Sequence, residues 1–289
     1  MKIQQCRQHP GSRARQRGLT LIELVVVLAI LVALAGLIIN NFPGIISRAH
    51  TSTCATTVGD VNKFESLAGT TGLGYPSGYD SLLNDGNGPA GLFSLLPGHT
   101  EPAYEAAGGV GGALTAGTVD ANESTALAAI GITNSYNLNP TAADATWSVT
   151  DYGSQNVFGI AQANVALVNN SYIISGGLNG GPLWPNEQNV ITNDINAGGT
   201  TKYVIFGVGP GTQEIGPSGL IQEAPTHFGD NEYMDPQNNY QRYGVVFRID
   251  DNPLTGTNAV YAGAVALHDD SLGTTEGDTH DYYNLPGVK

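Results

Sequence analysis

The longest apolar stretch of the chain lies close to its N-terminus. Residues 24–39 form a run of sixteen without a polar side chain, and over residues 19–39 only Thr20 and Glu23 interrupt the apolar pattern. At about 1.5 Å per residue, a helix over 19–39 matches the roughly 30 Å hydrocarbon core of a bilayer. The pattern therefore predicts a membrane-spanning helix.

The residues before this run are basic. Five of the 11 basic residues of the chain precede Gly18, and none of the 25 acidic residues does. The positive-inside rule therefore predicts a cytoplasmic N-terminus and an exported remainder. An ordinary secretory signal peptide is the alternative, but the small residues that its cleavage site would need, Ala33, Ala35 and Gly36, lie inside the apolar run.

Glu23 is the unusual residue of the segment. A carboxylate in hydrocarbon costs several kcal/mol (~3) unless it is paired. No Lys or Arg lies between Leu19 and Phe42. A cut after Gly18 would expose the α-amino group of Leu19 as a counterion, in the same subunit or in a neighbouring one.

The stretch from Arg17 to Glu23, RGLTLIE, followed by an apolar run, resembles the class III signal of type IV pilins and type II secretion pseudopilins. The resemblance implies that a prepilin peptidase cuts between Gly18 and Leu19 and methylates Leu19. It also implies that Glu23, the fifth residue of the mature chain, acts in filament assembly. Leu19 departs from the usual Phe, and Pro43 corresponds to the proline usual near the middle of the helix, although it lies slightly later.

The apolar spacing predicts that the helix continues to residue 68. Apolar residues recur at three- and four-residue steps, as on the buried face of an amphipathic helix. They are Phe42, Ile45, Ile46, Ala49, Val58, Val61, Phe64, Leu67 and Ala68. Gly69 to Gly72 are expected to end the helix. The predicted segments are thus a leader (1–18), a membrane or filament-core helix (19–39), an amphipathic continuation (40–68) and an exported head (69–289).

The second half of the head has the pattern of β-strands. β-branched and aromatic runs alternate there with Gly, Asn, Pro and Asp. The predicted strands are 157–168, 171–175, 202–208, 243–249 and 259–267. Between about residues 72 and 145 one short helix is expected, at 123–130, and no reliable core. The predicted fold class is α+β, a long N-terminal helix packed on an antiparallel sheet, as the pilin resemblance also implies.

Composition and charge support an exported protein. Only 12% of residues are charged, which suits a loop-rich extracellular β domain. From Leu19 onward the chain has six basic and 25 acidic residues. Such an acidic surface repels the phosphates of nucleic acid, so binding to nucleic acid is not expected. The two cysteines are Cys6, in the leader, and Cys54, so removal of the leader would leave no internal disulfide.

The sequence contains none of the common catalytic motifs, so we do not expect the protein to be an enzyme. The stretch Gly207 to Gly211, GVGPG, follows a predicted strand but precedes residues typical of a loop instead of a helix. A dinucleotide site requires the helix. We interpret the stretch as a turn in which glycines supply positive φ angles.

An acidic segment near the C-terminus is the candidate metal site. Residues 268–281 contain five carboxylates and two imidazoles, and Asp269, Asp270 and Asp278 could provide oxygen ligands to Ca²⁺. Some pseudopilins bind calcium in a loop near the C-terminus, so the resemblance adds to this hypothesis. The spacing is not that of an EF-hand, and a solvated acidic loop is the alternative. A weaker second site is predicted at Asp250 and Asp251.

The sequence therefore favours a structural subunit of a type IV pilus or of a type II secretion pseudopilus. Its expected partners are the prepilin peptidase, identical or related subunits, and the assembly machinery of the bacterial inner membrane. The expected location is the inner membrane in a single pass, and then a periplasmic or surface filament. The alternative is a binding module, in which the helix only mounts a head that recognises a surface, a glycan or a secreted substrate.

Overall fold

A computed structural model of the chain describes two compact units, Met1–Ile46 and Ser47–Lys289. The residues that it describes are 21–39, 42–72, 74–83, 92, 96, 113–136, 157–159, 164–170, 173, 200–217, 219, 221–226, 240, 242–267 and 272–273. Each unit is considered by itself below.

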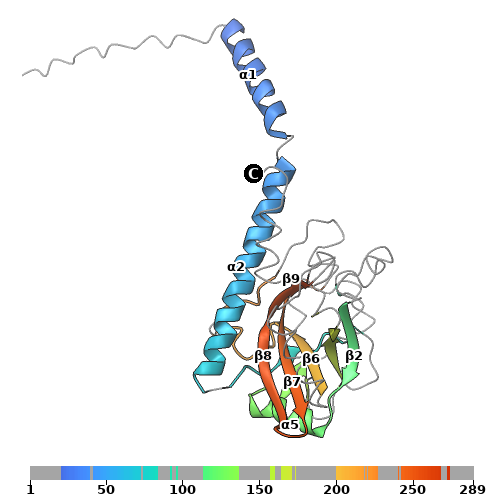
Figure 1. Ribbon diagram of the computed structural model, residues 1–289. Helices are drawn as coiled ribbons and strands as arrows, with labels where there is room; N and C mark the ends of the chain where they lie inside the picture. The colour runs from blue at the N-terminus through green and yellow to red at the C-terminus, as the bar shows by residue number, and fades with distance from the viewer. Residues whose placement is uncertain are drawn as a thin grey trace, which may run out of the picture. The chain divides into compact units, whose positions relative to one another are not determined.

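The first unit contains helix α1 (Leu21–Ile39), drawn in blue in Figure 1. Every side chain described in α1, over residues 21–36, is exposed. The predicted helix is confirmed over residues 21–39, whereas Leu19 and Thr20 lie outside the described residues. An apolar helix with no buried face is unfavourable in water. It is stable in an apolar environment or when packed against another apolar surface.

Helix α2 (Phe42–Thr70) begins with Pro43 in its first turn, where the missing amide hydrogen has no helical partner to lose. It ends two residues later than predicted, and Gly72 follows with a φ of 73°. Only glycine adopts that left-handed conformation without strain. The predicted C-terminal boundary at residues 69–72 is therefore confirmed. Residues 40 and 41 are not described, so the continuity of the helix from 19 to 68 stays a prediction.

The described residues of the head form one nine-stranded sheet and a short helix, α5 (Ala121–Ala129). Its strands are β1 (Tyr79–Asp80), β2 (Leu114–Thr118), β3 (Asn134–Tyr136), β4 (Val157–Gly159), β5 (Asn164–Val168), β6 (Thr200–Gly207), β7 (Tyr243–Asn252), β8 (Gly256–Leu267) and β9 (Leu272–Gly273). The strand order is β4-β3-β1-β6-β7-β8-β9, with β5 also pairing β6 and with β2 beyond it. All pairs are antiparallel except β1 with β3. The α+β prediction is confirmed.

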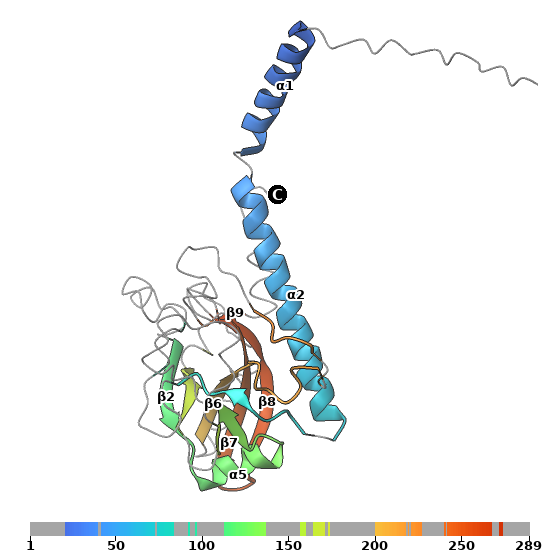
Figure 2. The ribbon, with the colours of Figure 1, turned by 180° about the vertical axis from the view of Figure 1, so that it is seen from behind.

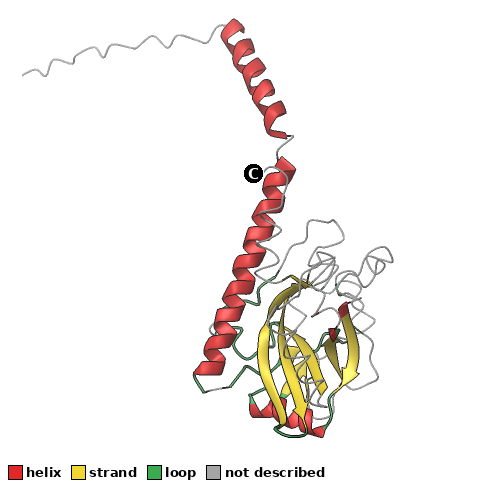
Figure 3. Cartoon of the chain, viewed as in Figure 1, coloured by secondary structure: helices red, strands yellow, loops and turns green. Residues whose placement is uncertain are grey.

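Both faces of the sheet are buried, by two separate apolar clusters. Along β6, Tyr203 and Ile205 belong to one cluster, whereas Val204 and Phe206 belong to the other. This alternation follows from the two-residue period of a strand. The face of Val204 packs against α2, which Figures 2 and 3 show alongside β8.

The buried face of α2 differs in part from the predicted one. Among the α2 side chains that the structure describes, the fully buried ones are Cys54, Val58, Val61 and Glu65. Val58 and Val61 confirm the amphipathic pattern, but Leu67 is 54% exposed and Ala49 is exposed as well, so the assignment of both to the buried face is wrong. The helix turns about 100° per residue, so a stripe through residues 54, 58, 61 and 65 leaves Leu67 on the solvent side.

The first half of the head contributes to the core, contrary to expectation. Tyr79, Leu82, Leu83 and Leu127 are all fully buried. These residues lie in turns and short elements without apolar periodicity, so their burial depends on strands that follow much later. The helix expected at 123–130 is confirmed as α5, whose capping box joins Asp120 and Glu123.

The strands predicted in the second half are confirmed with two corrections. The run 157–168 contains two strands, β4 and β5, instead of one. Ile173, within the predicted strand 171–175, donates its amide to the carbonyl of Asn169 at 3.1 Å and is helical. A short apolar run is compatible with either a strand or a helix, so its spacing alone did not distinguish them.

Candidate functional site

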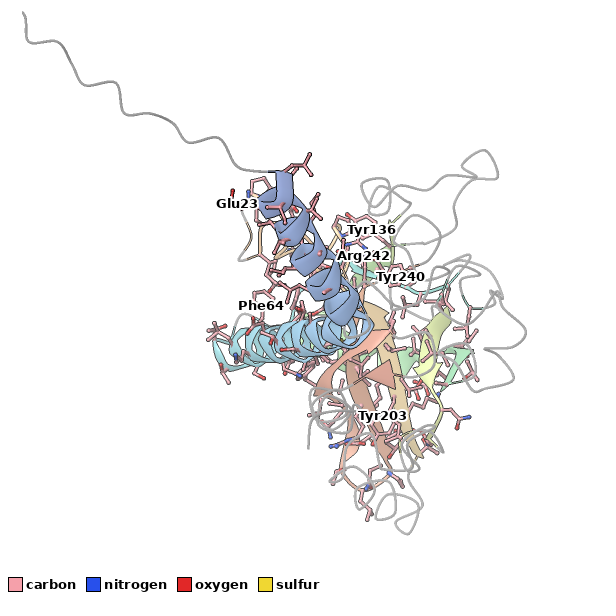
Figure 4. The ribbon with its side chains drawn as sticks, turned by 90° about the horizontal axis from the view of Figure 1, so that it is seen from above. Glu23, Phe64, Tyr136, Tyr203, Tyr240 and Arg242 are labelled. Carbon is pink, nitrogen blue, oxygen red and sulfur yellow. The ribbon has the colours of Figure 1, made fainter. Side chains whose placement is uncertain are left out.

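Glu23 lies in the first turn of α1, and its side chain is exposed, as are its apolar neighbours. Figure 4 labels it on the blue helix. A carboxylate is favourable at this end, because the unpaired amide groups of a helix N-terminus carry partial positive charge. The helix therefore presents one acidic group on an otherwise apolar surface.

The two processing residues, Gly18 and Leu19, lie outside the described residues. Cleavage between them and methylation of Leu19 stay predictions.

In the part of the chain that the structure describes, no helix reaches the length and apolarity needed to cross a membrane. The membrane-spanning helix over 19–39 also stays a prediction.

The predicted calcium ligands Asp269, Asp270 and Asp278 lie outside the described residues as well. At the weaker site, Asp250 accepts hydrogen bonds from Nε of Arg248 at 3.0 Å, and Asp251 accepts one from Thr257 at 2.8 Å. Among the described residues, no three His, Cys, Asp or Glu side chains are grouped in a way that could hold a metal. The calcium site near the C-terminus is untested.

The glycine stretch at 207–211 is a connection at the end of β6, but the predicted reason for its glycines is wrong. None of Gly207, Gly209 and Gly211 has a positive φ. A Cβ atom at Gly209 would lie 2.0 Å from Oδ2 of Asp80, and one at Gly211 would lie 2.2 Å from the ring of Tyr136. The glycines are needed because other side chains cross directly over this backbone.

One of those side chains, Asp80, belongs to a buried polar group that sequence reasoning missed. The hydroxyl of Tyr240 donates to Oδ2 of Asp80 at 2.7 Å, and Arg242 is also buried. Burial raises the pKa of Asp80 to about 7, against the lowering effects of Arg242 and Tyr240. Figure 4 labels Tyr240 and Arg242 at this end of the head, near Tyr136.

A second polar group joins α2 to the head. The side-chain oxygen of Asn62 accepts hydrogen bonds from the Tyr261 hydroxyl and from the amide of Ala264, both at 2.8 Å. One turn later Glu65, 1% exposed, accepts a 2.9 Å hydrogen bond from the Tyr79 hydroxyl. A polar residue at a buried position of an amphipathic helix was the available signal, because Glu65 follows Val58 and Val61 by seven and four residues.

In these two polar groups the buried carboxyls of Glu65 and Asp80 each accept a hydrogen bond from a tyrosine hydroxyl. The groups hold together segments that are distant in sequence. The exposed acidic group within the apolar helix α1, Glu23, lies apart in sequence from these buried groups.

Comparison with known families agrees with this. A model described as the prokaryotic N-terminal methylation motif matches residues 13–39. No characterised protein and no solved structure matches the chain. The match includes Gly18, Leu19, Glu23 and the whole of α1. Residues 13–39 are therefore a class III signal of the type IV pilin and pseudopilin kind.

Proposed function

We propose that this pilin-like protein is a structural subunit of a type IV pilus or of a type II secretion pseudopilus. The observation that carries the proposal is the position of Glu23. It is one acidic side chain on an exposed apolar helix, within the methylation motif. Such a helix requires an apolar environment, and such a carboxylate requires a positive partner within it.

Assembly supplies both requirements. Before assembly, the helix over 19–39 crosses the inner membrane once, with the basic leader in the cytoplasm. Prepilin peptidase cuts after Gly18 and methylates Leu19. In the filament, helices of neighbouring subunits replace lipid around α1, and the carboxylate of Glu23 pairs with the N-terminal ammonium of an adjacent subunit.

The pairing of Glu23 also selects the axial position of each new subunit. A subunit displaced along the filament would leave the carboxylate and the ammonium separated in apolar surroundings. Each unpaired charge there costs several kcal/mol (~3). This cost disfavours misplaced subunits more strongly than apolar contacts could, because apolar packing alone has little directional preference.

The proposal is tested by a Glu23→Ala variant in the host cell. We expect normal insertion and cleavage but a strong loss of filaments, measured by electron microscopy of sheared material and by fractionation of membranes. Asp60→Asn is the control, because it removes an exposed carboxylate from α2 and leaves α1 unchanged. Normal filaments from Glu23→Ala would contradict the mechanism.

Mass spectrometry of the N-terminus tests processing separately. We expect filaments to contain a chain that begins at a methylated Leu19. A filament protein that retains residues 1–18 would contradict the proposal. Long surface fibres in the wild type would indicate a pilus, whereas loss of protein secretion without such fibres would indicate a pseudopilus.

A further inference from the structure

Glu65 occupies a core position on α2. It continues the buried stripe of Cys54, Val58 and Val61, and its side chain is 1% exposed. An apolar residue at this position would contribute to the core by packing alone, without a hydrogen bond. A carboxyl group there is costly in its charged form, because burial removes water and the interior offers little compensation.

The groups around Glu65 come from four parts of the head. Tyr79 of β1 donates a hydrogen bond to it at 2.9 Å. Tyr75, before β1, and Tyr261 of β8 interact with its charge, and so does Glu214 in the turn after β6. Within the described residues, these titratable partners are all tyrosines or carboxylic acids. The groups that shift the pKa of Glu65 in the described part of the chain therefore include no cation that would stabilise its ionised form.

The electrostatics follow from this environment. Burial raises the pKa of Glu65 from its ordinary 4.5 to about 8, the hydrogen bond from Tyr79 lowers it, and the charge of Glu214 raises it. Burial also raises the pKa of Glu214 to about 7. Oε2 of Glu214 is buried without a hydrogen-bond partner among the described residues.

We propose that Glu65 makes the docking of α2 onto the head dependent on a proton, because the docked carboxyl holds a proton that it loses when α2 separates. The apolar stripe and the Asn62 hydrogen bonds provide the contact itself. The carboxyl decides how that contact responds to pH. Acidic conditions tighten α2 on the head, and a rise in pH loosens it.

The direction follows from proton linkage. Glu65 has a raised pKa when docked, so the docked state binds more protons than the separated state between pH 4.5 and about 8. Docking therefore weakens as the pH rises through this window. The equilibrium constant for opening increases about tenfold per pH unit. Above about pH 8 both states have lost the proton, and the dependence levels off.

Two neighbours of Glu65 shift the upper end of this window in opposite directions. The Tyr79 hydrogen bond favours the ionised carboxyl, so Tyr79→Phe moves the levelling point to higher pH. The charge of Glu214 disfavours ionisation of Glu65, so Glu214→Gln moves it to lower pH. A purely structural role for Glu65 predicts neither shift.

The experiment is hydrogen exchange by mass spectrometry on the full chain in detergent, from pH 5 to pH 9.5, corrected for the intrinsic pH dependence of exchange. The peptide over 54–68 reports opening of α2. We expect its protection to fall about tenfold per unit up to about pH 8 and then to level. Glu65→Gln should remove most of this slope, whereas Asp60→Asn, an exposed carboxylate on the same helix, should keep it.

The outcomes decide the proposal. Protection that is independent of pH in the wild type, or a full wild-type slope in Glu65→Gln, would overturn it. If Glu65→Gln fails to fold, the shifts in Tyr79→Phe and Glu214→Gln decide instead. Equal levelling points in the wild type and both variants would reject the proposal, and shifts in opposite directions would support it. Failure here would leave the assembly role of Glu23 untouched.

Discussion

The hydroxyl of Tyr240 donates a 2.7 Å hydrogen bond to Oδ2 of Asp80, across 160 residues of chain, and both side chains are fully buried. The bond holds the segment before β7 against β1. Arg242, two residues beyond Tyr240, contributes the positive charge that opposes the effect of burial on the pKa of Asp80. Asp80, Tyr240 and Arg242 therefore join the two halves of the head, and the pKa of the Asp80 carboxyl in this group is raised.

The stability of the head should depend on the protonation of Asp80. Its pKa rises from 3.8 to about 7 on folding, so the folded state retains a proton that the unfolded state releases. The free energy of unfolding should therefore fall as the pH rises from 3.8 to about 7, by up to about 1.4 kcal/mol per unit. Asp80→Asn should remove the part of this slope that corresponds to one bound proton. Denaturation of both proteins at several pH values measures the free energy of unfolding. An unchanged slope would show that Asp80 is ionised in the fold.

Gly209→Ala should destabilise the head by about 1–3 kcal/mol, because the new Cβ would lie 2.0 Å from Oδ2 of the buried Asp80. Chemical denaturation of the variant measures the loss. The double variant Asp80→Ala with Gly209→Ala is the control for cause. Truncation of Asp80 removes the clash. The loss of stability in the double variant should therefore be smaller, by about 1 kcal/mol, than the sum of the losses in Asp80→Ala and Gly209→Ala alone. Strict additivity would locate the damage elsewhere.

Asn62→Ala should weaken the attachment of α2 to β8. It leaves the Tyr261 hydroxyl and the Ala264 amide without their 2.8 Å acceptor, at an expected cost of about 1–3 kcal/mol. Thermal unfolding and protection of the α2 amides from exchange are the measurements. Ser66→Ala, at an exposed position of the same helix, is the matched control and should change stability by no more than about 0.5 kcal/mol. Equal effects of the two substitutions would refute the assigned role of Asn62.

Lys202→Met should destabilise the attachment of α5 to β6. Nζ of Lys202 lies 2.7 Å from Oε1 of Glu123, whose side chain is 3% exposed and would lose its positive partner. We expect a loss of about 2 kcal/mol, since a buried carboxylate without compensation is strongly unfavourable. Lys63→Met removes the same side chain from an exposed pair with Asp60 and should cost under about 0.5 kcal/mol. A similar small loss in both variants would mean that water replaces Lys202.

Local patterns predicted the regular elements well. The strands β6, β7 and β8 follow from β-branched runs, and α5 from a short helical segment. The two-residue strand β1 is too short to give such a signal, and its Tyr79 packs on Phe206 of β6, which follows much later in the chain. The burial of Tyr79, Leu82 and Leu83 likewise has no local pattern in the sequence that would predict it.

Two residues of α2 show the limit of prediction from apolar spacing. Leu67 was placed on the apolar face of α2 yet is exposed, whereas Glu65, a polar residue left out of that face, is buried. Hydrophobic periodicity gives the existence of a buried face, but the exact stripe depends on the surface that packs against it. Here the hydroxyl of Tyr79 makes a carboxyl acceptable at residue 65.

The sequence by itself determined the chemistry of residues 13–39. The methylation motif and the carboxylate in its apolar run are contiguous, so no fold is needed to bring them together. Tertiary structure alone decided which carboxyls are buried, why Gly209 must lack a side chain, and which residues hold α2 to the head. Burial and charge interaction depend on distance in space, and the partners Asp80 and Tyr240 become neighbours only after the sheet has formed.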